Sequence, residues 1–202
     1  MDSRVPLAIA IPQTSLTGRF DTAFLRTFLA RAEALGFSGG WVLEQTLGAI
    51  PILEPVELLA WAAAHTERLR LGTAVLLTST RSPVHLAKSL ATLDQLSGGR
   101  LDVGVGLGGR ADLYPATGIP NERRAARFAE GIRLMRRLWT EPRVTQTGGF
   151  WTLDNAGQEP KPLQRPHPPL WFGGHHPNAI RRAVELGHGF IGAGSIPAAR
   201  FA

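Results

Sequence analysis

The chain has 202 residues, of which 44% are apolar and 19% charged, a composition typical of a globular domain rather than a disordered or fibrous chain. It contains no cysteine, which excludes disulfides, thiolate metal sites, iron–sulfur clusters and a cysteine nucleophile. The formal net charge is +6, and all but two of the 22 basic residues are arginines, spread along the chain without an interleaved aromatic ladder. The densest cluster has helical spacing, which is typical of a solvated helix face, and comprises Arg123, Arg124, Arg127, Arg133, Arg136 and Arg137. This charge favours a phosphate-bearing small molecule over nucleic acid as the anionic partner.

No apolar run reaches the roughly 18 residues that a membrane span needs. The first residues include Asp2, and the apolar stretch that follows them stops at Pro12, which does not match a secretory leader. We therefore expect a cytoplasmic protein that does not contact a membrane.

In the first half of the chain, short apolar runs alternate with helical patterns. The runs predict strands, and apolar residues at helical spacing between them predict helices, the first of which is capped by Asp21. The expected strands cover 7–11, 40–43, 69–77 and 101–105, and the expected helices cover 22–35, a segment from Pro55, and 83–96. Strand starts recur about every 31 residues, which suits repeated right-handed crossovers in a parallel sheet, either a barrel or a doubly wound fold.

The period breaks in the second half. Asn121 is expected to cap a helix that runs to about Trp139, and residues 143–169 are expected to form a hairpin followed by a proline-rich connector. Regular order then resumes with a strand over 170–172, a helix opened by Pro177 and a short strand over 189–191. This gives six strands in all.

In parallel α/β folds the site lies beyond the carboxyl ends of the strands, so the residues that follow each strand are the candidates. Gly173 and Gly174 lie between a strand and a proline-led helix, where free backbone N–H groups can bind phosphate, although a plain tight turn is the alternative. His175 could assist such a phosphate; a metal site with its neighbour His176 is disfavoured because no carboxylate follows at helical spacing. Glu44 follows a strongly apolar strand, so a buried carboxylate there would need a partner.

The glycine-rich run from 104 to 109 does not open a helix directly, which argues against a dinucleotide fingerprint. Gly106 and Gly108 instead suit either a flexible loop or the close approach of backbone to a flat ligand.

Several motifs together resemble the bacterial luciferase-like family of flavin- and F420-dependent oxidoreductases. The matching stretches occur in family order over nearly the whole chain and lie at 72–77, 83–106, 133–140, 160–169 and 173–174. The resemblance implies a TIM-type (β/α)8 barrel with a hairpin insertion before strand five. Here the barrel is truncated to about six β-α units, so that residues 1–202 form a single domain that lacks the last two units. An open barrel would expose strand edges, and we therefore expect a homo-oligomer.

The resemblance also implies a site at the carboxyl-end mouth of the barrel. A bulge, often with a non-prolyl cis peptide, supports the cofactor ring in this family and maps to Ala74-Val75, and the phosphate-binding pair maps to Gly173 and Gly174. An acidic residue followed by histidine usually ends strand two, and the matching pair here, Glu44-Gln45, gives the candidate catalytic residues. Glu44 is the candidate to position the substrate or the ring, whereas Gln45 can form hydrogen bonds but cannot act as an acid or base. The family's sugar-phosphate dehydrogenases have an acid where this chain has Gly109, so that substrate class is not expected.

The function implied by the resemblance is hydride transfer between coenzyme F420 and a small organic substrate, and we favour it over the two alternatives that follow. One alternative is an FMN-dependent monooxygenase that uses oxygen and a partner flavin reductase, because the expected phosphate site would serve either cofactor. The other is a non-catalytic family member.

Overall fold

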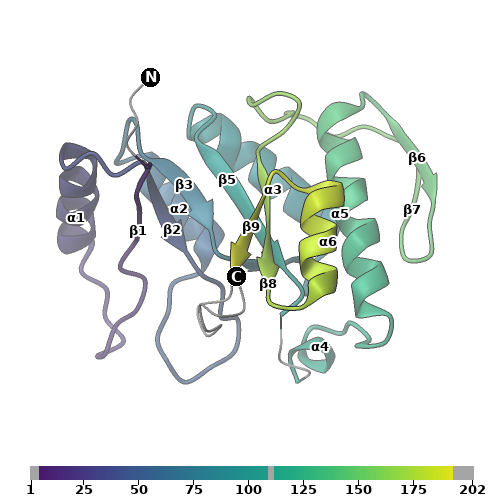
Figure 1. Ribbon diagram of the computed structural model, residues 1–202, viewed down its shortest axis with the longest axis horizontal. Helices are drawn as coiled ribbons and strands as arrows, with labels where there is room; N and C mark the ends of the chain where they lie inside the picture. The colour runs from purple at the N-terminus through teal and green to yellow at the C-terminus, as the bar shows by residue number, and fades with distance from the viewer. Residues whose placement is uncertain (1–4, 109–111, 193–202) are drawn as a thin grey trace.

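The computed structural model describes residues 5–108 and 112–192, and its parallel strands form a sheet curled into a half-barrel (Figure 1). The strand order is β1-β2-β3-β5-β8-β9, and the short β4 also pairs with β5. The strands of this sheet are β1 (Ala8–Ala10), β2 (Gly39–Val42), β3 (Arg70–Thr73), β4 (Leu76–Leu77), β5 (Leu101–Gly106), β8 (Leu170–Gly174) and β9 (Gly189–Gly192). This half-barrel agrees with the barrel architecture that the family resemblance implied.

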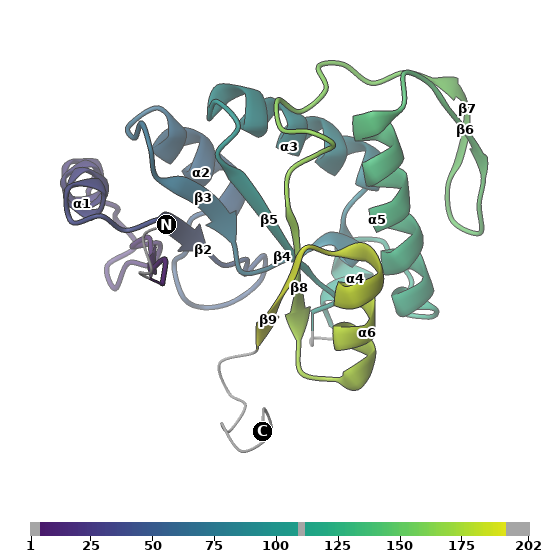
Figure 2. The ribbon, with the colours of Figure 1, turned by 45° about the horizontal axis from the view of Figure 1, so that its top comes forward.

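Helices cover the outside of the half-barrel, arranged in an arc around the strands (Figure 2). They are α1 (Thr22–Ala34), α2 (Pro55–Ala63), α3 (Pro83–Leu96), α5 (Arg124–Thr140) and α6 (Pro177–Leu186), with a short α4 (Leu113–Ala116) and a 3-10 turn, η1 (Thr78–Thr80), in the connections. The core lies between this arc and the sheet and is built mainly of leucine, valine and alanine side chains. No helix in the described part of the chain is long and apolar enough to cross a membrane.

The helix caps follow from the sequence. Asp21 Oδ1 accepts hydrogen bonds from the backbone N–H groups of Ala23 and Phe24 at 2.9 and 3.0 Å, and Ser82 Oγ accepts one from His85 at the start of α3. The helix expected from Asn121 instead begins at Arg124. Its first flanking residue, Arg123, has a positive φ of 55° and makes no side-chain cap, so the chain turns there before the helix starts. The helix α4 was not predicted.

The strand expected over 69–77 is divided into β3 and β4 by a bulge. Gly72 pairs with Asp102 and Leu76 with Val105, so this strand advances four residues while β5 advances three. Inside the bulge the peptide bond between Ala74 and Val75 is cis, as the family resemblance implied. The Thr73 hydroxyl bridges the gap in the ladder: it donates to the Gly104 carbonyl at 2.8 Å and accepts from the Gly104 N–H at 2.9 Å.

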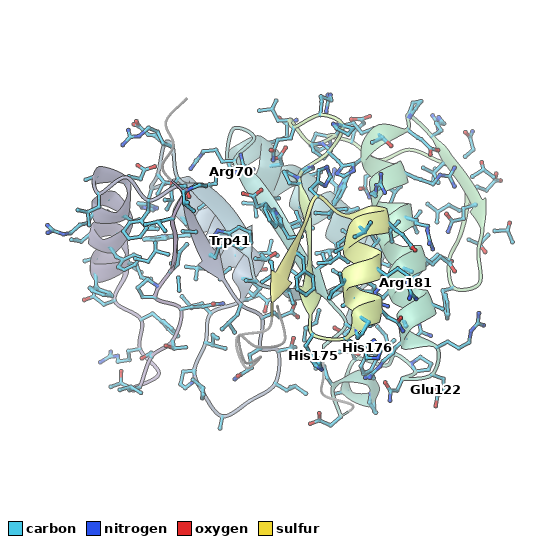
Figure 3. All side chains as sticks on the ribbon, in the orientation of Figure 1. Trp41, Arg70, Glu122, His175, His176 and Arg181 are labelled. Carbon is cyan, nitrogen blue, oxygen red and sulfur yellow. The ribbon has the colours of Figure 1, made fainter. Side chains whose placement is uncertain are left out.

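Two tryptophans fill the concave face. The ring of Trp41 lies against Gly72, where a β-carbon would come within 2.3 Å of the indole, and Trp171 lies against Gly189 in the same way. The two rings meet edge to face with centroids 6.1 Å apart. Arg70 forms a 2.6 Å ion pair with Asp102 on the same side of the sheet, and Figure 3 shows Arg70 above Trp41, toward the end where β3 begins.

The predicted hairpin is present outside the barrel as β6 (Val144–Thr147) and β7 (Thr152–Ala156). Its turn is held by Glu130 of α5, whose carboxylate accepts hydrogen bonds from the backbone N–H groups of Gly149, Phe150 and Trp151 at 3.1–3.2 Å. The proline-rich connector then leads back to β8, with cis bonds before Pro160 and Pro166.

Candidate functional site

A cavity of about 640 Å³ opens at the carboxyl ends of β4, β5, β8 and β9. Helices α5 and α6 form its outer wall. Its volume lies within the range typical of small-molecule and cofactor sites. The parallel sheet thus places its cavity where α/β barrels carry their ligands.

The floor of the cavity depends on Val75 and two glycines. A β-carbon on Gly106 would lie 2.6 Å from Val75 Cγ2, and one on Gly173 would lie 2.6 Å from Val75 Cγ1. Both distances are shorter than real β-carbon contacts allow, so only glycine permits Val75 to pack between β5 and β8. Ala74, the other residue of the cis peptide, is exposed to the cavity.

Aromatic rings from two elements line the outer wall. Phe128 of α5 and Phe172 of β8 are buried and meet edge to face with centroids 5.9 Å apart. The guanidinium of Arg182 on α6 lies 5.7 Å from the centroid of Phe128. Burial lowers the pKa of Arg182 from its ordinary value, with nearby Glu185 acting in the opposite direction.

The amino terminus of α6 faces the cavity. Gly174 precedes this helix with a φ of 155°, and a β-carbon there would lie 2.8 Å from the β-carbon of Ala179. The Nδ1 atom of His176 caps the helix by accepting a 3.1 Å hydrogen bond from the Asn178 N–H. Figure 3 shows His175 and His176 together at this end of the helix. Backbone N–H groups at a helix start, next to a glycine pair, form an anion-binding arrangement.

The polar side chains that line the cavity are cationic or neutral. Arg124 of α5, Arg182 of α6, His175 and His176 lie on it, and no carboxylate among the described residues does. Neither arginine forms an ion pair with another described residue. The cavity therefore combines an apolar floor with a positively charged rim.

Glu44 lies behind the cavity wall rather than in it. Its side chain is 1% exposed. Its Oε2 atom accepts a 2.7 Å hydrogen bond from the Leu77 N–H, and its Oε1 atom accepts from Arg81 at 2.8 Å and from Thr46 at 2.9 Å. Leu77 itself lines the cavity.

Arg81 links two carboxylates on this side of the site. It pairs with Glu44 and also with Glu54, the residue before α2. Burial acts to lower the pKa of Arg81, but the two carboxylates outweigh it and raise the pKa above the ordinary arginine value.

A second hydrogen-bond group holds the loop after β5. The Tyr114 hydroxyl, which is buried, donates to the Leu107 carbonyl at 2.8 Å and lies 2.9 Å from Ser79 Oγ. Leu107 lines the cavity beside Gly108. The cavity is thus supported from behind by Glu44 on one side and by Tyr114 on the other.

The sequence model of the luciferase-like monooxygenase family matches residues 1–202. The chain belongs to this family. Relatives of this chain include both F420-dependent and FMN-dependent enzymes. Luciferase-like oxidoreduction is therefore the class of chemistry that these relatives share.

Three relatives illustrate the range of this luciferase-like family. The F420-dependent glucose-6-phosphate dehydrogenase of Kineococcus radiotolerans is 34% identical over 181 residues, which is 86% of this chain and 53% of that protein. The FMNH2-dependent dimethylsulfone monooxygenase of Pseudomonas putida is 39% identical over 163 residues, or 77% of this chain and 44% of that protein. The crystal structure of monooxygenase RslO1 from Streptomyces bottropensis superimposes with a TM-score of 0.83 at 33% identity, covering 96% of this chain and 61% of that one. The chain spans about half the length of these curated relatives.

The structure brings most of the predicted site residues of this luciferase-like chain to one cavity. The residues predicted to bind the cofactor all line it, namely Ala74, Val75, Gly106, Gly108, Gly173, Gly174 and His175. The two predicted catalytic residues do not: Glu44 is turned toward Arg81, and the Gln45 amide lies against Gly48. Gly109, which stands where the sugar-phosphate dehydrogenases of the family have an acid, lies outside the described residues.

Sequence reasoning missed the arginines of the rim. Arg124 belongs to a cluster at helical spacing that was interpreted as a solvated helix face, but α5 turns this residue toward the cavity. The spacing of Arg124 and Phe128, four residues apart on one helix face, was the available signal. Arg182 stands three residues after the buried Ala179 on α6, again on a shared face.

Proposed function

We propose that this cavity binds the reduced deazaflavin F420 and that the protein transfers a hydride between F420 and a small organic substrate. The observation that carries the proposal is the cavity itself: an apolar floor that only glycines allow, next to a helix amino terminus and a cationic rim.

The residues of this chain fit such a group. Ala74 and Val75 would support the flat ring from the sheet side, with Phe128 and Phe172 closing the outer wall. The N–H groups at the start of α6 would bind the phosphate, and Arg182 would neutralise its charge. The bound cofactor would supply two-electron hydride chemistry, while the protein orients the substrate and keeps water out.

The charge of the rim supports F420 over FMN. F420 carries a phosphodiester and further carboxylates, whereas FMN ends in one phosphate. Two unpaired arginines and two histidines, with no carboxylate among the described lining residues, suit the more extended anion. The F420-dependent relative also aligns over more of this chain than the FMNH2-dependent one.

A second candidate is a monooxygenase that receives reduced FMN from a flavin reductase. The 39% identity with the dimethylsulfone monooxygenase favours it. The same helix terminus would bind the phosphate of FMN, so the two proposals differ in the cofactor and in the need for oxygen and a reductase partner.

We propose a positioning role for Glu44. Both carboxylate oxygens are already hydrogen-bonded, one of them to the backbone of a residue on the cavity wall. By holding the backbone of Leu77, this carboxylate would fix the part of the cavity wall that contacts the cofactor and the substrate. Gln45 lies outside the cavity, and its amide could not transfer a proton in any case.

The test is a fluorescence titration of the purified chain with F420 and, separately, with FMN. We expect saturable binding, tighter for F420, and weakening of about tenfold in Arg182→Gln because a charge-assisted contact is lost. Arg26→Gln, an exposed arginine on α1, serves as the matched control and should bind like the parent chain. Tighter binding of FMN would favour the monooxygenase candidate, and binding of neither cofactor would refute both.

A further inference from the structure

A second cationic hollow lies on the outer surface, on the far part of α5 from the cofactor cavity. We name it the arginine groove; it has a volume of about 290 Å³ and is lined by Arg133, Arg136, Arg137, Thr140, Pro166 and His167. Arg124, which lines the cofactor cavity, and Arg136 lie on the same helix about 18 Å apart, given the rise of an α-helix. Figure 1 shows α5 as a long helix; Arg124 is its first residue and Arg136 lies near its carboxyl end. The groove is therefore separate from the site described above.

Two of the three arginines in the groove have no acidic partner. Arg137 is held by Glu141 through hydrogen bonds of 2.7 and 2.8 Å. Arg133 and Arg136, in contrast, form no ion pair with any residue in the described ranges. Their guanidinium charges are thus available to an anion from solution.

The carboxyl end of α5 would ordinarily oppose anion binding, because its free carbonyls carry partial negative charge. Lys161 offsets this effect. Its ammonium group donates to the Leu138 carbonyl at 2.8 Å and to the Glu141 carbonyl at 2.6 Å. The helix end next to the groove is therefore already neutralised by Lys161, a partly buried cation of the connector.

His167 gives the groove a buried polar wall. The residue is 3% exposed, and its Nδ1 atom lies 2.8 Å from the Pro168 carbonyl. Because that carbonyl can only accept, Nδ1 carries the hydrogen. The Nε2 atom has no hydrogen-bond partner among the described residues. The groove thus has two free guanidinium groups on one side and an unpaired imidazole nitrogen on the other.

We propose that the arginine groove binds a phosphate-class oxyanion, held by Arg133 and Arg136 and by Nε2 of His167. A tetrahedral oxyanion matches these groups because guanidinium forks bind its charged oxygens in pairs, and the hydroxyl that phosphate keeps near neutral pH can donate to the lone pair of Nε2. A carboxylate would also bind the guanidinium groups, but it would leave Nε2 of His167 without a hydrogen-bond partner.

The experiment is a titration of the full chain with inorganic phosphate at constant ionic strength, with chloride as the exchanged anion. Binding is measured by calorimetry, and the side-chain resonances of His167 are followed by NMR. Because phosphate can also enter the cofactor cavity, the titration is done in both the parent chain and Arg182→Gln.

We expect a saturable phosphate site that persists in Arg182→Gln and shifts the His167 resonances. The double variant Arg133→Gln/Arg136→Gln should weaken it at least about fivefold, and Arg26→Gln should leave it unchanged. Arg133 is exposed and Arg136 half-exposed, so circular dichroism should show an intact fold in these variants. Unchanged affinity in the double variant, loss of all binding in Arg182→Gln, or a His167 signal that phosphate does not move would overturn the proposal.

Discussion

Glu44 accepts a 2.7 Å hydrogen bond from the backbone N–H of Leu77, and this bond joins the end of β2 to the wall of the cavity at the carboxyl ends of the strands. The same carboxylate neutralises Arg81, which in turn contacts Glu54 at the start of α2. Two consecutive β-α connections, the one before α2 and the one before α3, are therefore tied together behind the site by one buried acid and its arginine partner.

The first prediction concerns this acid. Glu44→Gln keeps the shape of the side chain but removes its charge, so Arg81 loses its main partner. We expect a loss of unfolding free energy of about 1–3 kcal/mol, and weaker cofactor binding because the wall at Leu77 is no longer fixed. Urea denaturation and the fluorescence titration would measure the two effects. Glu67→Gln, an exposed acid without an ion pair among the described residues, is the control, and equal behaviour of the two variants would contradict the assigned role.

A second prediction tests the packing of Val75. Gly173→Ala places a methyl group only 2.6 Å from Val75 Cγ1, so we expect a destabilisation of about 1–3 kcal/mol and a loss of cofactor binding. Val75→Ala removes the obstructing atoms, and the double variant should recover much of the stability lost in Gly173→Ala. Gly149→Ala, whose new methyl group would make ordinary contacts, serves as the control. A double-mutant cycle with no coupling between positions 75 and 173 would disprove this arrangement.

A third prediction concerns pH. Burial lowers the pKa of His167, an effect that the Pro168 carbonyl partly opposes and that the nearby Arg136 and His188 reinforce. The unfolded chain therefore takes up this proton at a higher pH than the folded chain does. Stability should fall as pH decreases through the unfolded value of about 6.5, and the fall should level off below the folded value.

This pH effect can be measured by denaturation at pH 7.5 and 5.5 in chloride buffer without phosphate. In His167→Gln the difference in stability between the two pH values should shrink, whereas the exposed His85→Gln should retain it. A difference of the same size in the parent chain and in His167→Gln would assign the effect to other groups.

A fourth prediction concerns Arg100, which holds the turn before β3. Its guanidinium donates to the carbonyls of Ala63, Thr66, Leu69 and Ser97 and to the Thr66 hydroxyl. Lysine keeps the charge but cannot reach this set, so Arg100→Lys should cost about 2–3 kcal/mol of stability. Arg31→Lys, on the exposed face of α1, should be neutral, and thermal unfolding would separate the two outcomes.

A fifth prediction follows from the edges of the sheet. Within the described residues, no strand pairs with the outer side of β1 or of β9. Exposed edges of this kind template association, so the 202-residue chain should self-associate in solution. Ala10→Lys, which places a charge on the exposed edge β1, should shift light-scattering profiles toward the monomer. A monomeric parent chain would show the expectation to be wrong.

The periodic part of the fold could be predicted from the sequence, because each strand and helix has its own local apolar pattern. The glycines of the site could also be predicted, since Gly173 and Gly174 precede a proline-led helix. The partners of Glu44 could not, because Leu77 and Arg81 lie 33 and 37 residues away in the chain and meet it only through the barrel. For the same reason the sequence pattern predicted Arg124 to be a surface residue. Packing, and not local spacing, decides which face of a helix is turned toward the cavity.

Trp41 and Trp171, packed edge to face over the glycines of the neighbouring strands, also give the concave face an optical reporter. Both indoles are only half-buried, whereas Trp139 is enclosed in the core. Indole emission shifts to shorter wavelength when water leaves the ring. Any molecule or polypeptide that covers this face would therefore shift the emission maximum of the intrinsic tryptophan fluorescence. Coverage of the half-barrel can therefore be followed in real time without a label.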